Sequence, residues 1–214
     1  MANNQVILAT YDDGREITVD HIHQWMSNSN VYELSKFIYQ RLYRRYIKPF
    51  EYKNQDYKKD YKDGFSIIAN CCLLIETYIS FTVPSLKTTH GKSEKCFGYF
   101  FVTNPRFLCF SDGGLTAAQY ANTKDRAKDS GIPHDFYVNV RCGILHNGET
   151  RNGWKISRSG KLFDATEKKI NATEFMKEMK KTIKEMHQRL EKSSFDDLGF
   201  QTYINRLRDL ISKT

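Results

Sequence analysis

The chain has 214 residues, a length that one hydrophobic core can serve, so we expect a single domain over residues 1–214. Its hydrophobic share of 40% and aromatic share of 14% suffice for a packed interior, which excludes a largely disordered chain. Lys and Arg number 33 against 25 Asp and Glu, and the net charge of +8 favours a polyanionic partner such as nucleic acid. Charge alone leaves a second explanation open, because any net charge far from zero also keeps a protein soluble.

The sequence does not predict export or membrane insertion. The first residues, MANNQVILATYDDG, lack a basic segment followed by an apolar run, so we expect no secretory signal and a cytoplasmic protein. The most apolar stretch, residues 65–83, is interrupted by Asn70, Glu76 and Thr77. We therefore expect this stretch to be a buried helix, with no membrane partner.

Cysteine usage and scattered carboxylates argue against structural cross-links and metal sites. The five cysteines, at positions 71, 72, 96, 109 and 142, are odd in number and form no Cys-x-x-Cys pair of the kind that zinc cages use. No His-Glu-x-x-His motif occurs. We expect reduced thiols that fill the core, and neither a metal nor a cofactor.

The N-terminal third is predicted to hold a hairpin, a helix and a charged connection. Residues 5–19 alternate apolar and polar around an Asp-Asp-Gly turn, which is typical of a hairpin. Residues 31–47 repeat apolar side chains at helical spacing, and Pro49 prevents much continuation. Residues 50–64 are rich in Tyr, Lys and Asp and should lie on the surface. Such a segment can track a phosphate backbone and stack on bases, although a solvated linker is the commoner form.

A second long helix is predicted at residues 65–81, apolar around most of its circumference as in the central helix of a bundle. Glu76 is the exception, because a buried carboxylate needs a partner or must take up a proton. Either it has such a partner, or it lies at a hydrated edge without a role. Beyond this helix we expect a short helix at residues 93–101 and a break at Pro105, with no clear order in the rest of residues 83–131.

A third helix, called the motif helix below, is predicted to begin near Pro133 and to end at Gly148. Residues 154–165 then form two short alternating runs on either side of Ser159-Gly160, which indicates a second hairpin.

Two C-terminal helices follow. Asn171 and Glu174 resemble a capping pair that opens the first of them, and Ser194 and Asp197 are candidate caps of the last. These elements together predict an all-α fold, an up-and-down helical bundle with small β-hairpin additions. Its core is expected at about residues 31–156, followed by the hairpin and C-terminal helices at 154–214.

The faces of the motif helix follow from a rotation of roughly 100° per residue. One side carries the apolar residues and should face the core: Phe136, Tyr137, Val140 and Ile144. The other side gathers Asn139, Cys142 and His146, which are spaced by three and four residues. We therefore expect these three side chains to point away from the core.

Arg141 lies five positions before His146, so the two side chains diverge by about 140° and are offset by roughly 7.5 Å along an ideal helix. They do not stack directly. If two such helices meet across a two-fold axis, both pairs can line one shared cleft.

These residue types suit RNA cleavage without a metal. His146 can act as general base or acid near neutral pH, Arg141 can hold the phosphate, and the 2′-hydroxyl would be the nucleophile. Asn139, Asn147 and Glu76 are candidate substrate-binding residues. An Arg and a His five residues apart are also a common coincidence, so a surface Arg and a His satisfied by its neighbours remain the alternative.

Two segments resemble the HEPN superfamily. The run RCGILHNGET is similar to its signature, which is Arg, four to six residues and then His. The helix CCLLIETYISF, which contains Glu76, resembles the earlier core helix of a bacterial HEPN group. The likeness covers about residues 64–156.

The resemblance implies a helical bundle that pairs as a homodimer. The two copies would join their Arg141 and His146 into a composite, metal-independent endoribonuclease site. Members of the superfamily serve in toxin–antitoxin modules, abortive infection and other bacterial defence, so an RNA substrate and an antitoxin or defence partner are implied as well.

Two positions depart from the family pattern. The residue after the Arg is often polar, frequently Asn, whereas here it is Cys142. Some toxins of this type carry, two residues after the His, a Tyr that a partner nucleotidyltransferase modifies, and here that place is Gly148. The alternative is a non-catalytic HEPN-like module that binds RNA or a partner protein, and a third is a helical structural protein whose charge is incidental.

Overall fold

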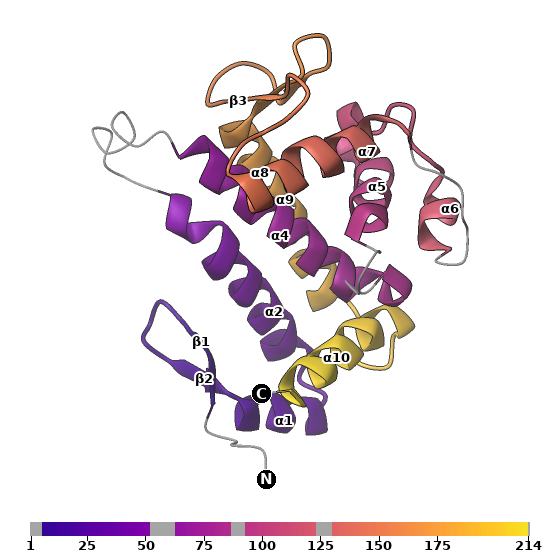
Figure 1. Cartoon of the computed structure of the whole chain (residues 1–214). Coiled ribbons are helices and arrows are strands. Elements are labelled where there is room, and N and C mark those ends of the chain that lie inside the picture. The colour runs from indigo at the N-terminus through magenta and orange to yellow at the C-terminus, as the bar shows by residue number, and fades with distance from the viewer. Residues whose placement is uncertain (1–5, 52–62, 87–92, 123–129, 214) are drawn as a thin grey trace. The chain divides into compact units, whose positions relative to one another are not determined.

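The computed structural model describes residues 6–51, 63–86, 93–122 and 130–213, and it confirms a mainly α-helical chain with small β additions (Figure 1). The α-helices in this part are α1 (Val19–Ser27), α2 (Val31–Tyr46), α4 (Gly64–Thr82), α5 (Ser93–Thr103), α6 (Ala117–Ala121), α7 (Ile132–Phe136), α8 (Cys142–Asn147), α9 (Ala172–Glu191) and α10 (Leu198–Ile211). The other helical turns are the 3-10 helices η1 (Lys48–Phe50), η2 (Pro84–Leu86) and η3 (Pro105–Phe110) and the π-turn η4 (Tyr137–Arg141). The strands are β1 (Ile7–Thr10), β2 (Glu16–Thr18), β3 (Lys155–Ser157), β4 (Phe163–Asp164) and β5 (Lys169–Asn171).

These elements form two compact units, each with buried apolar residues of its own. The terminal unit comprises residues 1–45 and 182–214, and the central unit comprises residues 46–181. Helix α9 contributes residues to both. The expectation of one domain over residues 1–214 stays a prediction.

The terminal unit begins with the predicted hairpin. Strands β1 and β2 pair antiparallel with Ile7 opposite Thr18 and Thr10 opposite Glu16. Gly14 in the turn has a φ of +83°, which favours glycine because a side chain strains the backbone there. Helix α1, which follows directly, is not among the predicted elements.

Two further helices of the terminal unit match the sequence patterns. Helix α2 confirms the helix expected at residues 31–47, and its apolar stripe is buried: Leu34, Phe37, Ile38 and Leu42. Asp197 caps α10, because its carboxylate accepts a hydrogen bond from the Gly199 N–H at 2.9 Å.

Helix α4 is the central helix of the central unit, as predicted for residues 65–81. Its apolar residues point into the interior on several sides: Ile67, Ile68, Cys71, Cys72, Leu74, Ile75 and Ile79. Within the described residues, α4 is also long and apolar enough to cross a bilayer, and 56% of that stretch is buried inside the protein. The core helix of a protein meets the same test of length and composition.

An aromatic cluster fills the rest of this core. Its rings come from α5, η3, the motif helix, α9 and the small sheet, which is the three-stranded sheet of β3, β5 and β4 with the residues next to it. Neighbouring rings lie 4.4–6.4 Å apart, centroid to centroid: Phe97, Phe100, Phe101, Phe107, Phe110, Phe136, Trp154, Phe163 and Phe175. Tilted and edge-to-face pairs of this kind add to the stability gained by burial. The short helix expected at 93–101 and the break at Pro105 are confirmed by α5 and η3.

The hairpin predicted for residues 154–165 is wrong. Strand β5 lies between β3 and β4, parallel to β3 and antiparallel to β4, so the two runs do not pair with each other. The physical reason is that β5 carries the fully buried Ile170. Its Asn171 also donates a hydrogen bond from the side-chain amide to the carbonyl of Gly160, which fixes the turn between the two runs.

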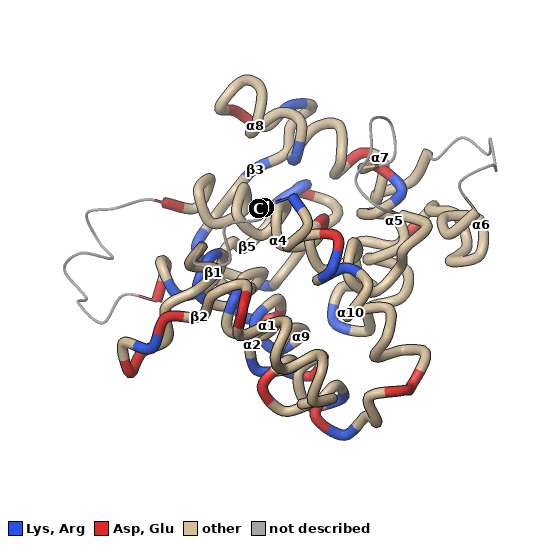
Figure 2. Tube along the Cα trace, turned by 90° about the horizontal axis from the view of Figure 1, so that it is seen from below, with Lys and Arg blue, Asp and Glu red and all other residues tan. Residues whose placement is uncertain are grey.

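The predicted basic, Tyr-rich connection at 50–64 lies mostly outside the described residues. By sequence, residues 52–62, 87–92 and 123–129 hold nine Lys and Arg against four Asp and Glu, a net charge of +5 out of +8. In the described part, Lys and Arg are interspersed with Asp and Glu (Figure 2). The described surface therefore has no large excess of positive charge.

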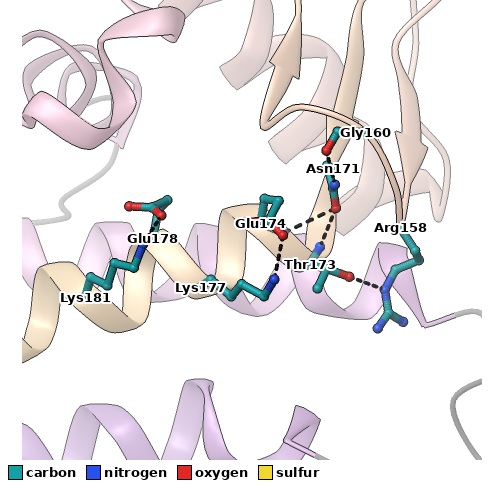
Figure 3. Close-up of polar contacts among 8 residues, drawn as sticks. All are labelled: Arg158, Gly160, Asn171, Thr173, Glu174, Lys177, Glu178 and Lys181. Carbon is teal, nitrogen blue, oxygen red and sulfur yellow. Dashed lines mark hydrogen bonds and ion pairs between the residues drawn. The ribbon is translucent and has the colours of Figure 1, made fainter. Parts of the chain in front are cut away.

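Asn171 caps helix α9, as predicted. Its side-chain oxygen accepts hydrogen bonds from the N–H groups of Thr173 at 3.1 Å and Glu174 at 3.2 Å (Figure 3). The same side chain therefore stabilises both the helix start and the Gly160 turn.

Replacing this residue tests the cap. We expect Asn171→Ala to lower the free energy of unfolding by roughly 1–2 kcal/mol, measured by urea denaturation, because two N–H groups lose their acceptor. Asn171→Ser keeps a capping acceptor and loses the donor to Gly160, so its loss should be smaller. Equal stability of Asn171→Ala and the original protein would contradict this role.

Candidate functional site

The motif helix is built from α7, the π-turn η4 and α8, and it confirms the helix expected at 133–148. Pro133 lies in its first turn, where its missing N–H costs nothing. Gly148 ends it with a φ of +73°, the left-handed geometry typical of a helix C-terminus. The π-turn at Tyr137–Arg141 was not predicted, and it changes which side chains face inward.

Asn139 is the site candidate that the π-turn displaces. It is only 4% exposed, and its side-chain amide donates to the carboxylate of Asp135 at 2.6 Å. The prediction that it lies on the outer face with Cys142 and His146 is therefore wrong, since a regular α-helical rotation does not hold through η4. Phe136 and Val140 are fully buried, as predicted for the inner face.

The loop after the motif helix folds back onto it. The N–H of Arg151 donates to the carbonyl of Asn139 at 2.9 Å. Gly143 lies so close to this loop that an added Cβ would be 2.5 Å from the carbonyl oxygen of Glu149. Glycine is thus required at position 143 for the loop to cover this side of the helix.

Asp135 joins the motif helix to the small sheet. Besides Asn139, its carboxylate accepts hydrogen bonds from the Trp154 indole N–H at 3.0 Å and from the Lys168 ammonium at 2.9 Å. Partial burial raises the pKa of Asp135, but the hydrogen bonds from Lys168, Trp154 and Asn139 outweigh it and hold the pKa below its ordinary value. Sequence reasoning missed this residue, although Asp135 and Asn139 are four residues apart.

Arg141 and Glu76 form an ion pair between the motif helix and α4. The guanidinium Nε and Nη2 both lie 2.8 Å from Glu76 Oε1, and the two side chains are 16% and 13% exposed. Burial alone lowers the pKa of Arg141, but the hydrogen bond and charge of Glu76 raise it above its ordinary value. The alternative in which Glu76 lies at a hydrated edge without a role is therefore wrong.

Tyr137 and Cys142 complete the surroundings of Arg141. The guanidinium carbon lies 5.5 Å from the centre of the Tyr137 ring, and Nη1 lies 3.9 Å from the Cys142 sulfur. Burial, followed by the nearby Cys142 thiol, raises the pKa of Tyr137 to about 12. Tyr137 therefore stays neutral near pH 7 and offers a polarisable face to the guanidinium.

His146 and Asn147 are exposed at the end of the motif helix. In the described part of the chain, no hydrogen bond or ion pair involves the imidazole. Arg141 is held against α4, whereas His146 is open to solvent, so one chain does not bring the two together. A solvent-facing imidazole can accept or release a proton and can meet a substrate.

Comparisons with known proteins leave the family open. No protein family model, no curated protein and no solved structure matches this chain. The described residues also hold no group of three or more His, Cys, Asp or Glu side chains arranged to bind a metal ion. The candidate site therefore rests on the motif helix, α4 and the small sheet.

Breaking the ion pair tests its energetic role. We expect Glu76→Ala to destabilise the protein by about 1.5–3 kcal/mol in urea denaturation, because a largely buried guanidinium loses a charged partner. The exposed pair Lys155–Glu167 is the matched control, and Glu167→Ala should cost under about 1 kcal/mol. In a double-mutant cycle, additive effects of Glu76→Ala and Arg141→Ala would show that the two side chains do not interact.

The lowered pKa of Asp135 predicts an acid-sensitive anchor. A carboxyl whose pKa is depressed by folding stabilises the protein above its unfolded pKa of about 3.9, and this stability is lost as the pH falls through the folded value. We expect Asp135→Asn to be less stable than the original protein at pH 7 and this difference to shrink below about pH 4. If denaturation measurements show the same difference in stability between the two proteins at pH 7 and below about pH 4, the assignment is contradicted.

Proposed function

We propose that the protein is a HEPN-type, metal-independent endoribonuclease that acts as a homodimer. The observation that carries this proposal is the difference in surroundings between two side chains of the motif helix. His146 is exposed to solvent, and five residues earlier Arg141 is held in place by Glu76. Phosphodiester cleavage needs an accessible proton-transfer group and a fixed cation, and two paired chains would bring these together.

In the proposed reaction, His146 takes the proton of a ribose 2′-hydroxyl. The 2′-oxygen attacks the adjacent phosphorus, the bond from phosphorus to the 5′-oxygen breaks, and the leaving oxygen takes a proton from an imidazolium. The products are a 2′,3′-cyclic phosphate and a 5′-hydroxyl, so no bound metal or cofactor is required. Arg141 is positively charged at neutral pH, as arginines are, and its Nη1 side, near Cys142, would face the phosphate.

Pairing of two copies is part of the proposal, and the positions of these side chains support it. Within one chain, Arg141 lies against α4 and His146 faces solvent, so a second motif helix would have to supply the complementary group. His146 of the partner subunit would then protonate the leaving oxygen. The proposal includes one HEPN-like domain with an up-and-down helical bundle and a cytoplasmic role in toxin–antitoxin or phage-defence systems, with an antitoxin or defence partner.

The candidate substrate residues differ in their suitability. Asn147 is exposed next to His146 and can contact RNA. Asn139 is buried and bound to Asp135, so its part is to hold the helix and loop together. Glu76 acts on the substrate only through Arg141, which makes it a positioning residue.

One observation favours a second candidate, a HEPN-like module that binds RNA or a partner protein without cutting. Glu76 and Tyr137 already engage the Arg141 guanidinium, and Cys142 stands where an amide is frequent in the family. In this case Arg141 would stabilise the helix pair rather than bind a phosphate.

Cleavage in the absence of metal separates the two candidates. We expect the purified protein to cut total RNA in excess EDTA, and His146→Ala to be slower by about 10²–10⁴-fold because proton transfer is lost. His23→Ala, an exposed histidine of α1, is the matched control and should cut normally. Equal cleavage by His146→Ala and the original protein would overturn the assignment, and salt-sensitive binding without any cleavage would favour the second candidate.

A further inference from the structure

A second arginine, Arg151, lies in the loop that folds back on the motif helix, and its backbone is fixed on both sides. Its N–H donates to the carbonyl of Asn139 at 2.9 Å, and its own carbonyl accepts from the N–H of Trp154 at 3.1 Å. The hydroxyl of Thr150 also donates to the Trp154 carbonyl at 2.6 Å. The start of the Arg151 side chain is therefore anchored directly to the π-turn.

The sequence explains why this turn is well defined. Asn152 and Gly153 both have positive φ, +49° and +77°, as the two central residues of a type I′ turn do. Asn-Gly is the pair favoured in such turns, because both residues tolerate the left-handed region. Trp154, at the end of the turn, stacks on Phe163 and donates to Asp135.

Although the backbone of Arg151 is fixed, its guanidinium has no ion-pair partner in the described part of the chain. Arg151 is also exposed. Neighbouring cations do have acidic partners: Lys155 with Glu167, Arg158 with Asp63, Lys161 with Asp164, and Lys168 with Asp135. Arg141 is paired with Glu76. A guanidinium on a fixed backbone and without a carboxylate is suited to bind an anion from outside the protein.

The helix geometry places this arginine on the side of His146. From Cys142 to Asn147 the helix is α-helical, so His146 lies about 60° around the axis from Gly143 and about 4.5 Å along it. Arg141 belongs to the π-turn, and its guanidinium lies against Glu76 of α4. Glu149 and Thr150 lie against Gly143, so the loop that carries Arg151 next in sequence covers the side of α8 near His146.

We propose that Arg151 is a phosphate-binding residue of the candidate site, which holds the RNA strand beside His146. This inference rests on the proposed function, because it takes RNA as the ligand. It assigns different tasks to the two arginines. Arg141, which Glu76 holds in place, would face the phosphate that is cleaved, whereas Arg151, which is exposed, would hold the RNA strand.

Binding of an uncleavable RNA tests the inference without requiring cleavage. The probe is a fluorescent oligouridine with 2′-fluoro groups, and anisotropy is measured between about 50 and 200 mM salt. Loss of one phosphate contact to a single strand should reduce the slope of log K against log salt by about 0.7, which we expect for Arg151→Gln. Arg151→Lys keeps the charge and should retain the slope. Lys161→Gln is the matched control, because it removes an exposed, paired cation of the same sheet region.

The outcomes separate this inference from the proposed function. If Arg151→Gln keeps the slope and affinity of the Lys161→Gln control, the inference is overturned, whereas the nuclease assignment still depends on His146→Ala. If the original protein binds no RNA at any salt concentration, both fail. Thermal denaturation checks folding, and Arg151→Glu, which should weaken binding further than Arg151→Gln, provides a second variant of the same exposed side chain.

Discussion

The π-turn at Tyr137–Arg141 is the constraint on which the candidate site depends. It turns Asn139 inward to Asp135, and the Asn139 carbonyl accepts the N–H of Arg151 from the returning loop. A buried polar side chain and a buried carbonyl would each be costly without such partners. The π-turn is therefore stabilised because Asp135 and the loop provide hydrogen-bond partners for the side chain and the carbonyl of Asn139. The same hydrogen bond holds the loop next to the end of the helix where His146 is exposed.

The Arg141–Glu76 pair adds an electrostatic constraint to this geometry. Two charges that are mostly withdrawn from water cost free energy, which their attraction and hydrogen bonds must offset. Removing either charge leaves the other without a partner in a mostly buried place. The ion pair therefore fixes the position of the motif helix along α4. The same pair limits the rotation of the guanidinium, which lowers the cost of ordering it around a phosphate.

Regular periodicity made much of the fold predictable. Helices α2 and α4 follow from the spacing of their apolar residues, and the start of α9 follows from Asn171, because these effects are local in sequence. Strand β5 was missed because its place between β3 and β4 depends on the burial of Ile170 in the core, which the alternation within residues 154–165 does not reveal. The face predicted for Asn139 was wrong because the π-turn depends on the returning loop, whose Arg151 N–H binds the Asn139 carbonyl, and regular helical rotation does not contain such a contact.

The site residues show the same division between local and long-range causes. Sequence could indicate that Glu76 needs a partner, since a carboxylate in an apolar helix is costly, but it could not say that the partner is Arg141, 65 residues later. Nor could it distinguish the two arginines by their spacing from His146, since each lies five positions from it. Their neighbours distinguish them: a carboxylate contacts the Arg141 guanidinium, whereas among the described residues Arg151 is held through its backbone. A substrate phosphate would therefore compete with Glu76 at Arg141, whereas no carboxylate of the described residues competes with it at Arg151, so the contact with Arg151 carries the smaller penalty for binding.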